Sequence, residues 1–577
     1  MFRIQRRWYE KNGGAERLFF GGSIRSMEEG DASIEAVATR GEKIIGVGTY
    51  DDCCRLFRGV PEKIDLRGRC LVPGFIDAHL HPSLMIYFRL HTDLKDVENR
   101  RELFAILGEK VTELGNGQWL VGLRVKDHLL SDPSVMTCHE LDAVSDKIPI
   151  VIIPHNGHMV LGNSAALRKA RVGRRAHLFP QELIDYDKHG QLTGVFREGA
   201  VDLLFRAIPK PGVRRLRRLV KETFDELVAN GITSCGGIFQ VGDEGPAGKQ
   251  GVSDIPLMLA FEEHIRPSLY GIIITDSSKK MRLIQQTSLH CSSETAYRRI
   301  GGVKIFADGT LGGSTACMHE PYSDQSGKGF MSMTDEDMYR RMVDAHLAGF
   351  QIAIHAIGDA ANRQCIELYR RLLGEYPRED HRHRIEHGSV LDAEMIKSIA
   401  ELKLNIVVQP QFIDSEKEWL FHRLGDQRSR WVYPFRSLFD AGVQVVGSSD
   451  APIESVNVIE ALEACVTRHG FETDQCLSPE EALRMYTING AYVQFDERIK
   501  GSIANGKQAD LVVLSDDPLA VEPENIGQIK VEETYIRGCR AYPVEIEESS
   551  SIFPVRAYGE LIKYSFHRFF GERFFPI

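Results

Sequence analysis

The sequence predicts an α/β protein with a parallel sheet of βα units and short strands at both ends of the chain. Between about residues 303 and 450, short apolar segments alternate with amphipathic helices, which is typical of a parallel sheet. Both termini instead carry short strand-like segments, which favours one small β-sandwich built from the two ends. Several βα units in series fit either a (β/α)₈ barrel or a doubly wound sheet.

The helices of the βα region have clear start and stop signals. Thr334 is a good N-cap, acidic residues follow it in the first turn, and Gly349 ends the helix. Asp359 and Asp392 begin two further helices, and a short helix ends at Gly442. The strands expected between these helices cover residues 303–308, 350–355, 383–387, 404–410 and 443–450.

The terminal and middle segments predict the domain organisation. Residues 34–48 predict a β-hairpin, and strand-like segments follow at 509–519 and 532–543. The stretch 83–300 is long for connections between strands, so we expect an inserted subdomain there. The domains expected are the two parts of the β-sandwich at 16–71 and 495–545, the βα core at 72–494 and an aromatic tail at 546–577.

Composition excludes several classes of protein. The 577 residues are 43% hydrophobic, enough for a sizeable core and more than one domain. The net charge of −10 argues against a nucleic-acid partner, which usually requires a basic surface. The 11 cysteines are odd in number and form no CxxC motif, which favours a reducing compartment. The basic start lacks an apolar signal core and no long apolar run follows, so we expect a cytoplasmic protein without a membrane span.

The tail at 546–577 contains unusually many aromatic residues. Phe569, Phe570, Phe574 and Phe575 are too apolar to be stable in water on their own. We expect the tail to pack against a partner subunit in a homo-oligomer or against the chain's own core. Contact with a membrane surface is the alternative.

Residues capable of metal chemistry fall at the carboxyl ends of the expected strands. In the first of these strands, FIDAHLH, the two histidines share one face because alternate residues of a strand point the same way. In a (β/α)₈ barrel, functional side chains gather at the carboxyl ends of the strands, so the whole set would meet at one mouth. The set is His79, His81, Lys304, His355, His387 and Asp450.

Each of these residues also has an ordinary structural interpretation. An HxH pair alone is a weak metal signal, and Lys304 alone would more often be a solvated lysine. His355 or His387 alone would more often be a hydrogen-bonded histidine at a strand end. Asp450 could cap the following helix, because SSDAP is a good helix start. All of these interpretations holding at successive strand ends is improbable, so together the residues favour a metal site.

Further characteristic segments occur along nearly the whole chain. They are LVPGFIDAHLHP (71–82), GHMVLGNSAAL (157–167), LTGVFREGA (192–200), GITS (231–234), VKIFADGTLGGSTA (303–316), IAIHAIGD (352–359), RIEHG (384–388), GSSDAPIES (447–455), EEALRMYTINGA (480–491) and GSIANGKQADLVVLSDDP (501–518). With these segments the chain resembles the metal-dependent amidohydrolase superfamily, in the branch of N-substituted formamide deformylase (amidohydrolase family 3). The resemblance implies a (β/α)₈ barrel beside a composite β-sandwich, and it does not specify a substrate.

The resemblance also implies the metal ligands. His79 and His81 would bind the more buried ion together with Asp450, and His355 and His387 would bind a second ion. Imidazole and carboxylate ligands suit Zn²⁺, and Mn²⁺ or Fe²⁺ fit as well.

Lys304 decides between one metal ion and two. As a carbamate formed with carbon dioxide, Lys304 would offer anionic oxygens and bridge both ions. Without the carbamate, a single-metal site remains. In it, one ion is held by His79, His81, His355 and Asp450, and His387 contacts the nucleophile or the substrate.

The implied ligands predict hydrolysis of a carbon–nitrogen bond, most simply an amide of a small molecule. A bound metal lowers the pKa of water from 15.7 to about 7 and polarises the substrate carbonyl. Asp450 would accept the proton of the attacking water and pass it to the leaving amine. Deamination or decarboxylation at the same site, and a catalytically silent regulatory protein, are the alternatives.

Three further residues are candidate substrate contacts. His158 matches the family motif, and its structural alternative is a buried, hydrogen-bonded histidine. Asp308 precedes a glycine-containing loop that could form a wall of the pocket, and Gln409 ends an expected strand and could face the substrate. Asn163, next to this motif, is expected to cap a helix instead.

Overall fold

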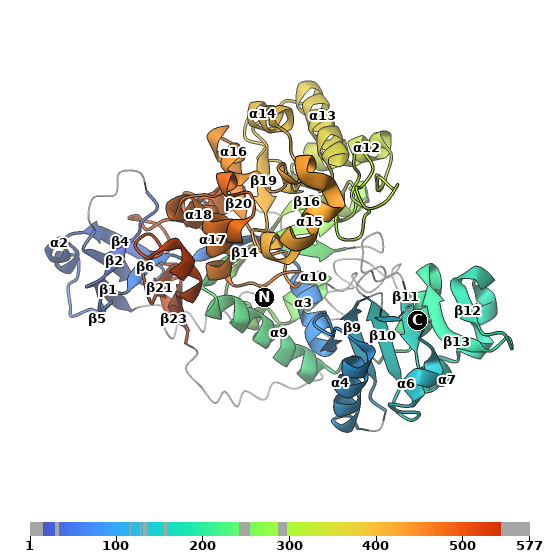
Figure 1. Cartoon of the computed structure of the whole chain (residues 1–577). Helices are drawn as coiled ribbons and strands as arrows, with labels where there is room; N and C mark the ends of the chain where they lie inside the picture. The colour runs from blue at the N-terminus through green and yellow to red at the C-terminus, as the bar shows by residue number, and fades with distance from the viewer. Residues whose placement is uncertain are drawn as a thin grey trace. The chain divides into compact units, whose positions relative to one another are not determined.

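The computed structural model describes residues 15–28, 34–115, 117–126, 129–130, 136–154, 159–209, 211–241, 254–286 and 297–543 (Figure 1). The chain divides into two compact units, one formed by Met1–Ser83 with Val220–Ile577 and the other by Leu84–Leu219. The tail expected at 546–577 lies outside the described residues. Within the described ranges, no helix combines the length and the apolar character needed to cross a membrane.

An eight-stranded parallel sheet forms the centre of the larger unit. Its last strand lies beside its first, where the backbone N–H of Asp450 donates to the carbonyl of His79 and that of His81 donates to Ala451, both at 2.8 Å. The sheet is therefore a nearly closed barrel, and the doubly wound alternative is wrong. The strands follow chain order around it: β7 (Phe75–Leu80), β14 (Ile232–Gln240), β15 (Ser268–Ile274), β16 (Arg298–Phe306), β17 (Gln351–Ala356), β18 (Arg384–His387), β19 (Asn405–Val408) and β20 (Gln444–Gly447).

Helices connect the barrel strands, and several begin where the sequence predicts. The Thr334 side chain caps α12 by accepting from the N–H of Asp337, and Asp392 caps α14 in the same way. The helices from β14 onward are α10 (Asp254–Ala260), α11 (Ser278–Gln285), α12 (Asp335–Leu347), α13 (Asp359–Glu375), α14 (Ala393–Glu401), α15 (Phe412–Ser429), α16 (Phe435–Asp440), α17 (Val458–Thr467), α18 (Pro479–Met485) and α19 (Ile488–Val493).

The two ends of the chain form two further sheets. One has the order β4-β3-β1-β5 and includes the predicted hairpin, and the other has the order β2-β6-β21-β22-β23 and joins both termini through the antiparallel pair β6–β21. A shared core of Phe19, Val37, Leu71, Leu511 and Tyr535 draws on both ends. The elements are β1 (Glu16–Phe20), β2 (Ser23–Ile24), β3 (Ala36–Arg40), β4 (Lys43–Gly48), α2 (Tyr50–Arg55), β5 (Glu62–Asp65), β6 (Cys70–Pro73), β21 (Leu511–Leu514), β22 (Val531–Ile536) and β23 (Cys539–Tyr542).

The smaller unit is a six-stranded sheet with helices and two apolar cores. Leu120 and Ile150 belong to one core and the adjacent Val121 and Val151 to the other, so the strands are buried on both faces. Asn163 caps α7 as predicted. The elements are α3 (Pro82–Leu90), which begins at the unit's edge, β8 (Thr92–Asp93), α4 (Arg100–Thr112), β9 (Leu120–Val125), α6 (Cys138–Asp142), β10 (Ile150–Pro154), β11 (Met159–Gly162), α7 (Ser164–Ala170), β12 (Ile184–Tyr186), β13 (Leu192–Arg197) and α8 (Asp202–Phe205). Helix α9 (Val213–Ala229) begins in this unit, and its residues from Val220 onward belong to the larger one.

This unit is shorter than the insertion expected over residues 83–300. It ends at Leu219, and β14 and β15 within that range are the second and third strands of the barrel. The segment of β14, ITSCGGIFQ, carries small polar residues and two glycines, which weaken the apolar signal of a buried strand.

Candidate metal centre

The barrel closure brings His79, His81 and Asp450 together. His79 and His81 alternate along the end of β7, and Asp450 follows β20. The Asp450 Oδ1 atom lies 2.9 Å from His81 Nε2 and 3.3 Å from His79 Nε2, and one ligand atom from each residue lies within 4.8 Å of the others. The Nε2 atom of His79 is buried, and within the described structure it has no hydrogen bond of acceptable geometry. A metal ion would satisfy this nitrogen, so the residues fit a metal site.

Asp450 does not serve as a helix cap. The helix after β20, α17, is capped by Asn457, whose side chain accepts from the N–H of Ile459. Asp450 itself has a left-handed backbone, with φ of 56°, and its N–H is used in the barrel closure. The capping interpretation of Asp450 is therefore wrong.

His355 and His387 complete a continuous group of imidazole rings. The ring centroids of His355 and His387 lie 4.6 Å apart, those of His387 and His79 5.4 Å apart, and those of His79 and His81 5.4 Å apart. His355 lies near the end of β17, and His387 is the last residue of β18. The structure thus brings all four predicted histidines to the carboxyl ends of the barrel strands.

Partners outside the group of histidines and Asp450 hold one nitrogen of three of these rings by hydrogen bonds. His79 Nδ1 contacts the Glu386 carboxylate, His387 Nδ1 lies 2.8 Å from Gln409 Oε1, and His355 Nε2 lies 3.0 Å from the Gly309 carbonyl. Each contact requires the proton on that nitrogen and leaves a lone pair on the other one, as in histidines that bind metals. The nitrogens left for a metal are His79 Nε2, His387 Nε2 and His355 Nδ1.

The electrostatics keep the ligands in the forms that bind metals. Burial, together with the charge of Lys304, lowers the pKa of His355 to about 3, and burial also lowers the pKa of His81 and His387. Burial alone would raise the pKa of Asp450, but contacts with the histidines outweigh it and hold that pKa well below its ordinary value. Neutral imidazoles and an ionised carboxylate are the ligand forms that a divalent ion requires.

Lys304 lies in the barrel interior and is 2% exposed. Burial lowers its pKa to about 8, although the carboxylates of Glu386 and Asp450 partly offset this shift. Its Nζ atom is 5.3 Å from the ring centroid of Phe306, which itself lies 5.6 Å from the ring of His355. Lys304 therefore lies among the predicted ligands and has an appreciable unprotonated fraction near neutral pH.

In the structure, Gln409 contacts His387 and Asp308 lies close to His355. Gln409 is 1% exposed, and its amide accepts from His387 and donates to Ser448 Oγ at 2.9 Å. The Asp308 carboxylate accepts the backbone N–H groups of Cys317, Ile357 and Gly358, and it lies 3.5 Å from His355 Nε2. Gln409 thus supports the His387 ring, and Asp308 holds the backbone at residues 317, 357 and 358. Neither set of contacts can be read from the sequence.

His158 lies outside the described residues, so its position relative to the site is not defined.

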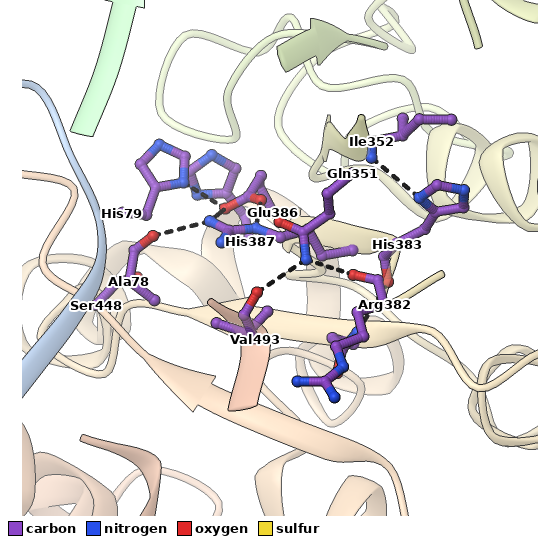
Figure 2. A network of polar contacts seen from close by, with 12 residues as sticks. Ala78, His79, Gln351, Ile352, Arg382, His383, Glu386, His387, Ser448 and Val493 are labelled. Atoms are coloured by element: carbon purple, nitrogen blue, oxygen red, sulfur yellow. Dashed lines mark hydrogen bonds and ion pairs between the residues drawn. The ribbon is translucent and has the colours of Figure 1, made fainter. Parts of the chain in front are cut away.

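Two buried charged residues were not among the predicted site residues. Arg384 and Glu386 are both fully buried and form an ion pair inside the barrel, and Figure 2 shows the Glu386 carboxylate beside His79. Burial alone would raise the pKa of Glu386, but Arg384 and His79 outweigh it and hold that pKa well below its ordinary value. The signal was present in RIEH, where an arginine and a glutamate two residues apart share one face of a buried strand.

The comparisons with known proteins agree with this geometry. The model of the amidohydrolase family matches residues 62–542. The amidohydrolase YtcJ of Bacillus subtilis (strain 168) is 29% identical, over 91% of this chain and 99% of its own length. N-substituted formamide deformylase of Arthrobacter pascens is 25% identical, over 91% of this chain and 98% of its own length.

Solved structures show the same fold. An uncharacterised metal-dependent hydrolase from Pyrococcus horikoshii OT3 superimposes with a TM-score of 0.71, at 24% identity, covering 88% of this chain and 99% of that one. The resemblance inferred from the sequence motifs is confirmed. From residue 62 to residue 542, the chain belongs to the amidohydrolase family.

Proposed function

We propose that the protein is a metal-dependent hydrolase that cleaves an amide-type carbon–nitrogen bond of a small organic molecule. The observation that carries the proposal is the group of four imidazoles with Asp450, in which His79 Nε2 is buried and has no hydrogen-bond partner within the described structure. The similarity to YtcJ and to N-substituted formamide deformylase supports a hydrolase of this kind.

His79, His81 and Asp450 would hold one divalent ion, with Zn²⁺ favoured by the imidazole-rich ligands. His355 Nδ1 and His387 Nε2 would hold a second ion. A bound divalent ion supplies a nucleophile at neutral pH, by lowering the pKa of water, and polarises a carbonyl oxygen.

Lys304 would bridge the two ions as a carbamate. Its pKa of about 8 supports this assignment, because only the unprotonated amine reacts with carbon dioxide. The carbamate would also replace a buried positive charge by a negative one next to the ligands.

Asp450 would carry the proton during the reaction. Its carboxylate is ionised at neutral pH, so it can accept a proton from the attacking water, and it can return that proton to the nitrogen of the leaving amine. His158 would contact the substrate.

Metal content and product identity test the proposal. The purified chain is assayed for bound metal, as isolated and after addition of Zn²⁺, Mn²⁺ or Fe²⁺, and then with a panel of N-acyl and N-formyl amides while amine, ammonia and carbon dioxide are measured. We expect one or two ions per chain and metal-dependent release of an amine. Asp450→Asn should lower this release by about 10²- to 10⁴-fold, whereas His139→Gln, at a side chain 70% exposed, should not change it.

Other results would redirect or refute the proposal. Release of ammonia alone would indicate a deaminase, and release of carbon dioxide alone would indicate a decarboxylase with the same site. A chain that binds no metal, even after reconstitution, would exclude the metal-dependent reaction and leave the catalytically silent alternative.

A further inference from the structure

One ion pair inside the barrel contacts β7, the strand that carries His79, at two points. Glu386 accepts from His79 Nδ1 through Oε2 and from Arg384 Nε through Oε1. Arg384 Nη2 donates to the same Oε2 and also to the carbonyl of Ala78, each at 2.9 Å. The pair therefore binds both the ring of His79 and the backbone immediately before it.

These contacts cross the barrel interior between strands that are not neighbours. Glu386 and Arg384 belong to β18, which pairs with β17 and β19, whereas His79 belongs to β7, which pairs with β14 and closes the barrel beside β20. The β18 backbone is itself held by Tyr369, whose hydroxyl donates to the Arg384 carbonyl at 3.0 Å. Figure 2 shows Glu386, His79 and Ala78 side by side.

The contact with Glu386 also selects the chemical form of the ring. A carboxylate opposite Nδ1 requires the proton on that nitrogen, so the lone pair of His79 is fixed on Nε2, which faces Asp450. Without an acceptor at Nδ1, the ring could carry its proton on either nitrogen and could rotate. The fully buried pair is therefore placed to fix the proton position and the orientation of the His79 ring.

We propose that the Arg384–Glu386 ion pair positions His79 and thereby sets the affinity and geometry with which the site binds a divalent metal. The inference rests on the proposed function, because it assumes that His79 is a ligand. Arg384 and Glu386 are positioning residues, since the contacts described place neither of them against substrate or metal.

A matched pair of double variants isolates the acceptor for His79. Arg384→Met with Glu386→Leu removes both charges and the acceptor, whereas Arg384→Met with Glu386→Gln removes the charges and keeps a neutral acceptor. Both replace a buried ion pair by uncharged groups of similar size, a change that folded proteins often tolerate. Each protein is titrated with Co²⁺ in its metal-free form, and the visible spectrum reports affinity and ligand geometry without any need for turnover.

We expect the Met/Leu variant to bind Co²⁺ about 10- to 100-fold more weakly, with an altered spectrum, and the Met/Gln variant to recover much of the loss. Glu386→Asp gives an independent test, because it keeps the charge opposite Arg384 but withdraws the carboxylate from His79, and it too should weaken binding. Tyr339→Phe is the control, because it removes a hydroxyl that donates to Glu375 between α12 and α13 and touches neither β7 nor β18, so it should leave the Co²⁺ affinity unchanged.

The outcomes separate this inference from the proposed function. Equal affinities of the wild type, the Met/Leu variant and Glu386→Asp would overturn the positioning role. Equal weakening in the Met/Leu and Met/Gln variants would show that the acceptor at His79 is not what matters. A wild-type chain that binds neither Co²⁺ nor Zn²⁺ would instead refute the metal site itself, and this inference with it.

Discussion

Three buried histidines away from the proposed metal ligands should make the barrel sensitive to acid. The Ile352 N–H donates to His383 Nδ1 at 3.0 Å, so the His383 proton is on Nε2, which faces His346 Nδ1 at 2.8 Å. The His383 N–H donates to His381 Nδ1 at 2.9 Å, and His381 Nε2 donates to the Leu402 carbonyl at 3.1 Å. Every acceptor nitrogen in this cluster is thus occupied, and a second proton would break a hydrogen bond.

Acidification is therefore the perturbation that tests the cluster. Burial lowers the pKa of His381 to about 4, that of His383 well below its ordinary range, and that of His346 in the same direction. The positive charge of Arg378 adds to the lowering at all three, and the carboxylate of Asp380 opposes it at His381.

The sign and size of the effect follow from these pKa values. An unfolded chain takes up a proton on each histidine near pH 6.5, whereas the folded chain excludes it, so stability is lost as the pH falls from about 6.5 to about 4. For His381 alone, the pKa is about 6.5 in the unfolded chain and about 4 in the folded one. At about pH 5 this difference lowers the unfolding free energy by about 2 kcal/mol. His346 and His383 act in the same direction.

Urea unfolding of the metal-free protein at a series of pH values measures this loss without a contribution from metal release. His381→Gln is the matched variant, because an amide can accept from the His383 N–H and donate to the Leu402 carbonyl but does not titrate. Its unfolding free energy should depend less steeply on pH than that of the wild type, by about 1 kcal/mol per pH unit between pH 6 and 5. Identical slopes for the two proteins would refute the reasoning.

Three further predictions concern the metal site. Asp450→Asn should lower turnover by about 10²- to 10⁴-fold in a chain that still folds, and steady-state kinetics with the substrate found by screening would contradict this if kcat were unchanged. Gln409→Leu leaves His387 Nδ1 without an acceptor and should weaken Co²⁺ binding by about 10- to 100-fold, whereas an unaltered titration would show that His387 needs no such support. Chelation should lower the melting temperature and Zn²⁺ should restore it, since free metal at about 1,000 times Kd adds about 4 kcal/mol; a melting temperature indifferent to chelator would count against a resident metal.

The arrangement of the proposed ligands could be predicted from the sequence because it follows from strand ends. His79, His355 and Asp450 each follow an apolar segment, and parallel strands in a barrel bring their carboxyl ends together whatever the chain between them does. Helix starts such as Thr334 and Asp392 were predictable for a similar reason, since a cap depends on a side chain and a backbone group only three residues apart.

Contacts that depend on distant residues could not be predicted in this way. Gln409 occupies a strand-end position, from which we predicted a substrate contact, and only the structure shows that its amide accepts from His387 and donates to Ser448. The same holds for Asp308, whose carboxylate is taken by backbone N–H groups of residues 317, 357 and 358. Strand periodicity gives the face of a residue but not its partner.

Strand periodicity is also insufficient at the end of β18, where two adjacent residues reach the same ring. Glu386 and His387 would point to opposite faces of a regular strand, yet Glu386 binds His79 Nδ1 and the His387 ring lies 5.4 Å from the His79 ring. The left-handed backbone at His387, with φ of 72°, makes this arrangement compatible with the chain, and Asp450 has the same kind of backbone. Each such non-glycine residue costs about 1–3 kcal/mol and persists only where its surroundings hold it. Left-handed non-glycine residues also occur elsewhere in the described chain, so the strain alone does not mark the site. What ties His387 and Asp450 to it is that both of these strained positions direct their side chains at the same ring, His79.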